Sequence, residues 1–272
     1  FQGRVVRAKS AEERRTLAQR IREMNVDVLA VQEVEDITTL RLFATEDLAE
    51  MYRYTVLVEG NDPRLIDLGL LSKLPIGGIT SWQHVVHPEE PGKPVFSRDL
   101  LEVEILNPTR TRRLFTLYNN HLKSHYVPYD EDPDEGAYRA NTRRRRQAET
   151  VARVVASRMR PSSPYIVLGD MNDSPHSPYL APLVHAPGLG LVNALANPTE
   201  TRPAKPDDPP PSNPSWTHRY RARGEPPRYD LFDQIWLSPS LARRQTGAWI
   251  HRRRTHSGDG SDHDPAWVRL AL

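Results

Sequence analysis

Acidic, amide and histidine side chains recur at the ends of four predicted strands. The stretches are VQEVED (31–36), NNHLKSH (119–125), VLGDMNDSP (167–175) and SDHDPAW (261–267). Strand ends at one edge of a sheet converge in space, so polar groups scattered along the chain can assemble into one site. The chain has no cysteine, so a metal at such a site must be held by oxygen or imidazole.

Each stretch taken alone also fits an ordinary structural role. Charged groups are costly to bury without partners, and Gly, Asp and Asn favour tight turns, so a polar residue after a strand is commonly solvated. The residues open to both interpretations are Glu33, His121, Asp170, Asn172, Asp262 and His263. Their occurrence together favours a site over separate turns, whereas we interpret Asp264 as a turn residue.

The composition sets broad limits on function. The 272 residues are 38% hydrophobic with a formal net charge of +2, and arginines are concentrated at 143–146 and 252–254. This permits a polyanionic substrate without showing one. No apolar run reaches bilayer-spanning length and no charged-then-apolar leader is present, so we expect a soluble chain. The sequence indicates neither a compartment, nor an oligomeric state, nor a protein partner.

The expected elements are many strands and two substantial helices. Ser10 and Glu13 have capping-box spacing ahead of a helical repeat, which predicts an amphipathic helix over 10–24. A longer helix is expected at about 137–160, with its valines on one face. Strands are expected at 26–34, 52–58, 67–72, 79–86, 97–106, 112–121 and 165–170, and a final strand after Pro265.

The remaining segments predict a single domain over residues 1–272. Pro-rich residues 197–214 are neither helix nor central strand, because proline lacks the amide donor, so we expect a surface loop. The segment after this loop is too small for a second domain, and we therefore expect one α/β domain with two sheets and outer helices. The first three residues, FQG, match the end of a cleavable expression tag and are left out of this reasoning.

In their order and spacing, the motifs resemble those of the endonuclease/exonuclease/phosphatase superfamily of metal-dependent phosphoesterases, and bacterial members in particular. GDMN or SDH alone is a weak signal, whereas the ordered set is specific. The matching stretches are LAVQEV, GLLSKLPI (69–76), FSRDLLEVEI (96–105), NNHLKS, GDMNDSP, YDLFDQIWLS (229–238) and SDHDP. The resemblance implies a four-layer α-β-β-α sandwich of two mainly antiparallel sheets with flanking helices.

The resemblance also implies a role for each matching residue. Glu33 and Asp262 match acids that bind or lie near the metal. Arg98, Asn120 and Lys123 match positions that contact substrate. The expected catalytic residues are His121, Asp170, Asn172, Asp233 and His263, with Asp233 paired to His263.

These implied roles suit the hydrolysis of a phosphate ester. Phosphate oxygens repel hydroxide, so the site needs positive charge where negative charge develops. Mg²⁺ or Mn²⁺ held by Glu33 would supply that charge, because both ions prefer oxygen ligands. We expect Asp170 to orient or deprotonate a water, and Asn172 to donate to a phosphate oxygen. His263 would steady the phosphoryl group, since the neighbouring Asp233 raises its pKa.

Two features depart from the family pattern. Members normally begin with a strand carrying a metal-binding asparagine, in stretches such as FNV, and nothing of the kind precedes the helix at 10–24. We expect that this first strand lies upstream of the sequence given. FSRDLL also replaces the more usual arginine-proline pairing, so Arg98 is open to an alternative role as a strand residue in a salt bridge.

The family does not fix the substrate, and three classes stay open. We favour a nuclease or general phosphodiesterase, with a lipid or small-molecule phosphoesterase of sphingomyelinase or phosphatase type as the alternative. A catalytically silent phosphate-binding module is the third class, disfavoured because six polar strand ends are retained. The acidic stretch HYVPYDEDPDEGAY (125–138) argues mildly against a broad DNA groove. Asp173 follows GDMN where inositol phosphatases usually carry an arginine, which argues against an inositol phosphate substrate.

Overall fold

Strands outnumber helices in the part of the chain that the computed structural model describes, residues 9–160, 162–201, 211, 213–253 and 260–272. The helices are α1 (Ala11–Met24), α2 (Ile37–Leu42), the π-helical turn η1 (Phe43–Asp47), α3 (Pro133–Arg158), α4 (Ala181–Val184) and α5 (Pro239–Ala242). The strands are β1 (Val28–Val34), β2 (Tyr54–Val58), β3 (Asp67–Ser72), β4 (Ile76–Ser81), β5 (Val86–His87), β6 (Glu90–Pro94), β7 (Leu100–Leu106), β8 (Arg113–His121), β9 (Tyr165–Asp170), β10 (Val192–Asn193), β11 (Thr199–Glu200), β12 (His218–Tyr220), β13 (Arg228–Asp230), β14 (Asp233–Leu237), β15 (Gln245–Ile250) and β16 (Ala266–Leu270).

The largest sheet has six strands in the order β10-β14-β9-β8-β7-β4. All its pairs are antiparallel except β8 with β9, whose connection contains α3. A second sheet has the antiparallel order β1-β3-β2, and a third has the order β11-β15-β16. The hairpins β5-β6 and β12-β13 stand apart from these sheets. The fold is thus a mixed α/β arrangement, as the sequence pattern predicts.

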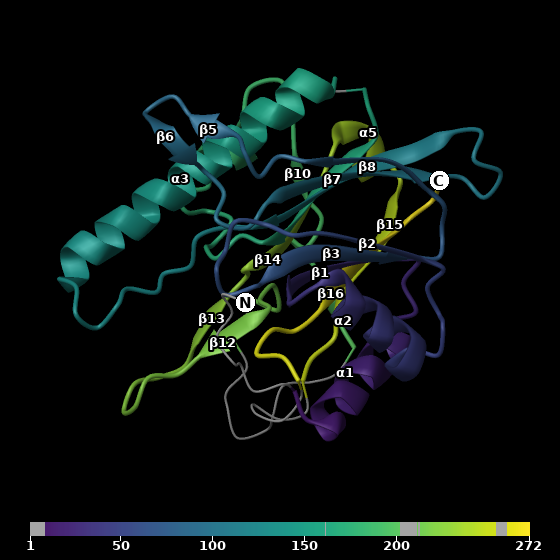
Figure 1. The fold of residues 1–272 in the computed structure, drawn as a ribbon, viewed down its shortest axis with the longest axis horizontal. Coiled ribbons are helices and arrows are strands. Elements are labelled where there is room, and N and C mark those ends of the chain that lie inside the picture. The colour runs from purple at the N-terminus through teal and green to yellow at the C-terminus, as the bar shows by residue number, and fades with distance from the viewer. Residues whose placement is uncertain (1–8, 161, 202–210, 212, 254–259) are drawn as a thin grey trace.

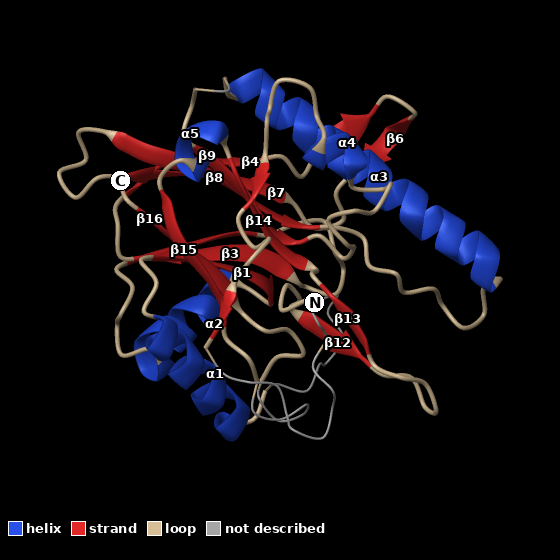
Figure 2. Cartoon of the chain, turned by 180° about the vertical axis from the view of Figure 1, so that it is seen from behind, coloured by secondary structure: helices blue, strands red, loops and turns tan. Residues whose placement is uncertain are grey.

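Three apolar clusters hold these elements together. One packs α3 and α4 against β8 and β9, and a second joins β2 and β3 to the inner side of the six-stranded sheet and to β15 and β16. The third packs α1 and α2 against β1 and β3. Figures 1 and 2 accordingly show α3 on one outer side of the strands and α1 with α2 on the other.

Helix α1 forms where its sequence predicts, and its start is defined by the expected cap. The Ser10 hydroxyl accepts from the backbone of Glu13, and the Glu13 carboxylate accepts from the backbone of Ser10. Such a capping box satisfies amides that have no partner inside the helix. Ala18, Ile21 and Met24 form the buried face, so the capping-box prediction is confirmed.

Several element boundaries differ from expectation because side chains compete for backbone groups. The helix expected at 137–160 begins earlier, at Pro133, because Asp132 caps it and proline is tolerated at the first helical position. The strand expected at 79–86 ends at Ser81, where the amide of Trp82 donates to the carboxylate of Asp99. Strand β9 has the predicted bounds 165–170.

The Pro-rich segment is only partly among the described residues. Thr199 and Glu200 form β11, which pairs with β15 at the outer edge of its sheet. An edge position agrees with the expectation that this segment forms no central strand. Residues 202–210 and 212 lie outside the described part of the chain, and so does FQG at 1–3. Within the described residues, no helix has the length and apolar character needed to cross a bilayer.

Candidate active site

Three neighbouring strands bring the predicted catalytic residues to one edge of the six-stranded sheet. In the parallel pair β8/β9, His121 lies opposite Asp170, and in the antiparallel pair β14/β9, Asp233 lies opposite the same Asp170. His263 follows β15 in the chain, and its Nδ1 lies 2.6 Å from Oδ2 of Asp233. Three residues from distant parts of the sequence, His121, Asp233 and His263, therefore meet around the carboxylate of Asp170.

Gly169 explains why β8 and β9 approach closely at this edge. Its φ is +129°, and a Cβ at this position would lie 2.0 Å from the carbonyl oxygen of Asn120. An L-amino acid side chain here is excluded both by the backbone conformation and by the neighbouring strand. The glycine of the GDMN motif is thus required for the position of Asp170.

Asp170 is buried and is held by the residue two positions along the chain. Its Oδ1 accepts from the backbone amide of Asn172 at 2.8 Å, and its Oδ2 accepts from Nδ2 of Asn172 at 3.1 Å. Burial, reinforced by the negative charge of Asp233, raises the pKa of Asp170 to about 7. The carboxylate is therefore poised to exchange a proton near neutral pH.

The amide group of Asn172 is engaged within the protein. Besides Asp170, Nδ2 of Asn172 donates to the carbonyl oxygen of Leu122 at 3.1 Å. Both amide hydrogens are thereby used, so this structure shows Asn172 positioning Asp170. Donation from Asn172 to a phosphate oxygen stays a prediction and requires one of these bonds to be exchanged.

His263 is held as an imidazolium by Asp233. Burial alone lowers the pKa of His263, but the charge and hydrogen bond of Asp233 outweigh it and raise the pKa to about 10. Desolvation raises the pKa of the partly buried Asp233, but the charge and hydrogen bond of His263 in return outweigh it and keep that pKa below its ordinary value. Near neutral pH, Nδ1 donates to Asp233 and Nε2 carries a second hydrogen available to a ligand.

His121 has the opposite protonation state. Burial lowers its pKa to about 3, and the charge of Arg98 acts in the same direction. Its Nε2 lies 3.5 Å from Oδ2 of Asp170 and 3.9 Å from Oε1 of Glu33, while Nδ1 is buried without a hydrogen-bond partner among the described residues. His121 is thus a neutral imidazole between two carboxylates.

Glu33 places an exposed carboxylate at this edge. Its side chain is 62% exposed, and its backbone has a positive φ of 60°, a conformation that is uncommon outside glycine and is found at functional turns. Among the described residues, no lysine or arginine lies within ion-pair distance of Glu33. Arg64 and Arg98 interact with the charge of Glu33 at longer range without pairing with it directly. An exposed carboxylate beside the buried Asp170 is a donor set that fits a divalent ion with oxygen preference.

The three residues expected to contact substrate lie in different surroundings. Arg98 is buried and its Nε lies 3.4 Å from Oδ2 of Asp62, so the structure shows the salt-bridge alternative, and substrate contact stays a prediction. Asn120 is fully buried and its amide donates to the carbonyl oxygens of Tyr118 and Leu168, so substrate contact by Asn120 stays a prediction. Lys123 is half-buried with Nζ bonded to two backbone carbonyls, and burial lowers its pKa to about 8.

Metal binding by Asp262 stays a prediction, whereas Asp264 differs from expectation. The ligand atoms of Asp262, His218 and His263 lie close enough together to hold one ion, and Glu33 is not part of this group. The assignment of Asp264 to a solvated turn is wrong, because the side chain is 1% exposed. Its carboxylate pairs with Arg253 at 3.0 Å and Arg252 at 3.3 Å. Arg252 and Arg253 are therefore paired inside the protein, Arg252 also with Glu200.

Two groups of side chains at the site carry no distinctive local sequence signal. One is a row of aromatic rings in which His218 stacks on Phe232 at 4.9 Å and tilts against His263 at 4.8 Å. The other centres on the buried Arg144 of α3, which donates to Asp173 at 2.9 Å and to the carbonyl oxygen of Lys123. Arg144 thereby ties α3 to the loops after β8 and β9.

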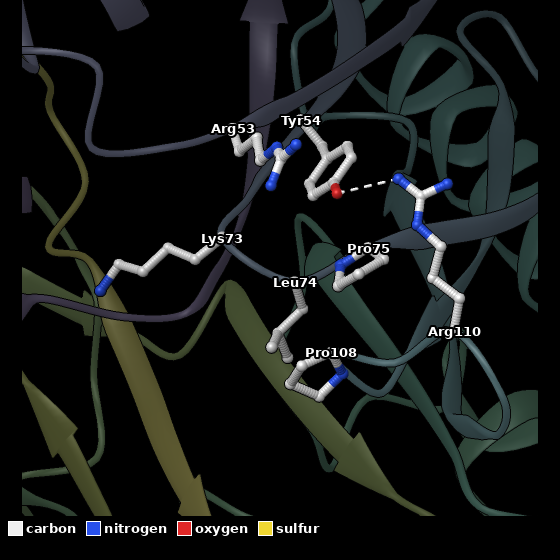
Figure 3. Close-up of a pocket in the computed structure, with 7 residues that line it drawn as sticks. All are labelled: Arg53, Tyr54, Lys73, Leu74, Pro75, Pro108 and Arg110. Atoms are coloured by element: carbon white, nitrogen blue, oxygen red, sulfur yellow. Dashed lines mark hydrogen bonds between the residues drawn. The ribbon is translucent and has the colours of Figure 1, made fainter.

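A cavity of about 220 Å³ lies away from this edge. It is found where Tyr54 of β2 pairs with Ser72 of β3, at the opposite end of these strands from Asp67, which pairs with Val34. Figure 3 shows Arg110 donating to the hydroxyl of Tyr54, with Lys73 pointing away from them. The cavity is lined by Arg53, Tyr54, Lys73, Leu74, Pro75, Pro108 and Arg110. Because none of these is a carboxylate or a histidine, the cavity lacks the groups needed for the chemistry at the strand ends.

Comparisons with known proteins agree with the motif order. Residues 6–263 match the Endonuclease/Exonuclease/phosphatase family. No curated protein matches. Among solved structures, an endonuclease/exonuclease/phosphatase family protein from Leptotrichia buccalis C-1013-b is 14% identical with a TM-score of 0.62, covering 100% of this chain and 97% of the other.

Two further structures with similar folds have different titles. An AP endonuclease from Archaeoglobus fulgidus is 17% identical with a TM-score of 0.64, covering 97% of this chain and 96% of the other. A mannosyl-6-phosphatase from Bacteroides thetaiotaomicron is 14% identical with a TM-score of 0.59, covering 96% and 91%. At these identities the likeness establishes the fold and leaves the substrate open.

Proposed function

Because the chain belongs to the endonuclease/exonuclease/phosphatase family, we propose that it is a divalent-metal-dependent phosphoester hydrolase acting on phosphodiesters, as a nuclease or general phosphodiesterase. The observation that carries the proposal is the meeting of Asp170, Asp233 and His263 at one strand edge, where a side-chain atom of each lies within 4.8 Å of the others. Asp170 has a pKa of about 7, and His263 beside it has a pKa of about 10. Hydrolysis by a positioned water needs such a base next to such a cation.

Asp170 is the group that we assign as the general base. An imidazolium has no free lone pair, so His263 cannot accept the proton of a water while its pKa stands near 10. Asp170 retains an acceptor site, and its pKa lies close to neutral pH, where a general base is most effective. The backbone amide and side chain of Asn172 hold the carboxylate in place.

His263 and His121 are assigned to the phosphate oxygens. Nε2 of His263 would donate to an oxygen on which negative charge increases as the water attacks, and Asp233 keeps that hydrogen in place. The neutral His121 would offer a second, uncharged donor from Nε2, which lies 3.5 Å from Asp170. A charged and a neutral donor on one edge would bind the transition state more strongly than the ground state.

Glu33 is assigned to hold the divalent cation, Mg²⁺ or Mn²⁺. When bound, this ion would supply positive charge that stabilises the phosphoryl oxygens and orients the substrate. The exposed carboxylate of Glu33, free of lysine or arginine partners among the described residues, supports the assignment. We also propose a single domain with the architecture of a four-layer α-β-β-α sandwich. The three apolar clusters, which pack helices on both outer sides of the strands, support this architecture.

The arginines of α3 limit the kind of nucleic-acid contact that we propose. Arg144 is buried on Asp173, and Arg145 and Arg146 pair with acids at positions 89, 90 and 149. These side chains therefore do not form a free basic stripe along the helix. Contact with a phosphodiester would be concentrated at the catalytic edge, so short or single-stranded substrates fit better than a long duplex groove.

A substrate panel tests the proposal and separates it from the alternatives. The panel contains plasmid DNA, single-stranded DNA, RNA, bis-p-nitrophenyl phosphate, sphingomyelin and a sugar phosphate monoester, each with and without Mg²⁺ or Mn²⁺. Metal-dependent cleavage of a diester, lost in Asp170→Ala, is the expected result. Cleavage of sphingomyelin or the monoester alone would replace the diesterase proposal by the lipid or small-molecule alternative. A folded protein that cleaves nothing would favour the silent phosphate-binding module.

A further inference from the structure

A second group of metal-competent side chains lies beside the catalytic carboxylates. His218 of β12, Asp262 and His263 each offer one ligand atom, and these atoms lie within 4.8 Å of one another. A backbone bridge between residues 218 and 263 brings the two histidines together, and their ring centroids are 4.8 Å apart. Glu33 is not a member of this group, so the arrangement differs from the magnesium site assigned above.

His218 is held in place, and within the described part of the chain its side chain makes no hydrogen bond. Its ring stacks on Phe232 with a centroid distance of 4.9 Å and an interplanar angle of 13°. Its Nδ1 is buried and has no hydrogen-bond partner among the described residues. A buried nitrogen without a partner is uncommon in folded proteins, because losing its hydrogen bond to water costs free energy. A ligand bound at Nδ1 of His218 would remove that cost.

The donor atoms indicate the class of ion. Two imidazoles and one carboxylate suit zinc and neighbouring first-row transition metals, whereas Mg²⁺ prefers oxygen alone. Nδ1 of His263 is already bonded to Asp233, which leaves Nε2 as its ligand atom. A carboxylate on the far nitrogen is the usual support for a metal-bound histidine, since it fixes the ring and raises its basicity.

We propose that His218, Asp262 and His263 form a binding site for Zn²⁺ or a similar transition-metal ion, and that the bound ion inhibits phosphoester hydrolysis. Binding replaces the hydrogen on Nε2 of His263, which is released to solvent, with a bond from Nε2 to the metal. His263 then has no hydrogen to donate to phosphate. The inhibitory effect rests on the proposed function, whereas the binding of Zn²⁺ does not.

Calorimetric titration with Zn²⁺ in the absence of substrate tests the binding site directly. We expect one tight site per wild-type chain, with affinity at least about tenfold lower in His218→Asn and in Asp262→Asn. His218→Cys, which restores a zinc ligand, should bind more tightly than His218→Asn. Two matched controls should bind as the wild type does. They are His125→Asn, which removes an exposed imidazole stacked on Phe232 at 5.9 Å, and Glu33→Gln.

Equal affinity in the wild type and His218→Asn, or no zinc binding by the folded wild type, would overturn the proposal. Thermal melting of each variant establishes that it is folded before its affinity is compared. For the inhibitory effect, Zn²⁺ is added to the hydrolysis reaction at saturating Mg²⁺, and inhibition should be weaker in Asp262→Asn than in wild type. Zinc binding without any hydrolysis would keep the site and reject the proposed function, so the two failures are distinguishable.

Discussion

Replacing Asp233 with asparagine removes the carboxylate whose Oδ2 lies 2.6 Å from Nδ1 of His263. The charge and hydrogen bond of Asp233 are the strongest influences that raise the pKa of His263 to about 10. Without them, burial opposes the remaining charges of Asp170 and Asp262, and we expect the pKa of His263 to fall to about its ordinary value of 6.5. At about pH 7.5 the protonated fraction of His263 would then fall from nearly all to about one-tenth.

If the imidazolium is the active form, this loss has a defined dependence on pH. We expect kcat/KM of Asp233→Asn, relative to wild type, to be about tenfold lower at pH 7.5 and to approach that of wild type near pH 5.5. The assay is hydrolysis of bis-p-nitrophenyl phosphate across this range, with NMR titration of the His263 ring to measure its pKa. Asp262→Asn is a matched control that removes a nearby charge and leaves the Asp233 hydrogen bond intact.

A ratio of variant to wild-type activity that does not change with pH would refute this reasoning. In that case Asp233 would act on the orientation of His263 rather than on its protonation. A His263 pKa that stays high in Asp233→Asn would refute it independently of activity.

Three further predictions concern the metal and the buried charges. Glu33→Gln should raise the Mg²⁺ concentration needed for half-maximal hydrolysis at least about tenfold. It should not lower the melting temperature, because the side chain is mostly exposed; an unchanged Mg²⁺ requirement would show that Glu33 does not hold the metal. Burial raises the pKa of Asp99 to about 7, so the ionisation of Asp99 destabilises the fold as pH rises from about 4 to above 7. In urea unfolding, Asp99→Asn should therefore be more stable than wild type by on the order of 3 kcal/mol at pH 8 but not at pH 4; equal differences at both pH values would contradict this. Asp264→Asn leaves buried arginines without their partner and should lose about 3 to 5 kcal/mol of unfolding free energy; a loss below about 1 kcal/mol would show that these pairs contribute little.

Local features of the fold were predictable because neighbouring residues determine them. The capping box of Ser10 and Glu13 defines the start of α1 within a four-residue window. The apolar run YIVLGD gives strand β9 its predicted bounds, because its residues are apolar, partly β-branched and followed by turn formers. The hairpin β12-β13 was not predicted, since RYRARGEPPRYD lacks the regular apolar alternation that indicates a strand.

The site was predictable where motif order carries information and was not where a contact spans the chain. Asp170, Asp233 and His263 meet as the resemblance implies. Arg144 has the same local surroundings as three neighbouring arginines, so nothing in the sequence distinguishes the one that is buried on Asp173. His218 is likewise a single histidine whose proximity to His263 depends on pairing between distant segments.

The role of Asp264 was misjudged for a related reason. A sequence with acid, histidine, acid and proline is typical of an exposed turn. Its buried position depends on two arginines from the preceding segment and on Arg20 of α1, 244 positions away. Long-range charge pairing of this kind leaves no periodic signal in the sequence.

The rate of bis-p-nitrophenyl phosphate hydrolysis by wild type and Asp170→Asn, with Mg²⁺ and with chelator, tests the central claim most directly. Asparagine keeps the size of the side chain and removes its ability to accept a proton. The account predicts Mg²⁺-dependent hydrolysis by wild type and a loss of at least about a hundredfold in a folded Asp170→Asn. Equal rates for the two proteins, or wild-type hydrolysis that persists in chelator, would contradict it.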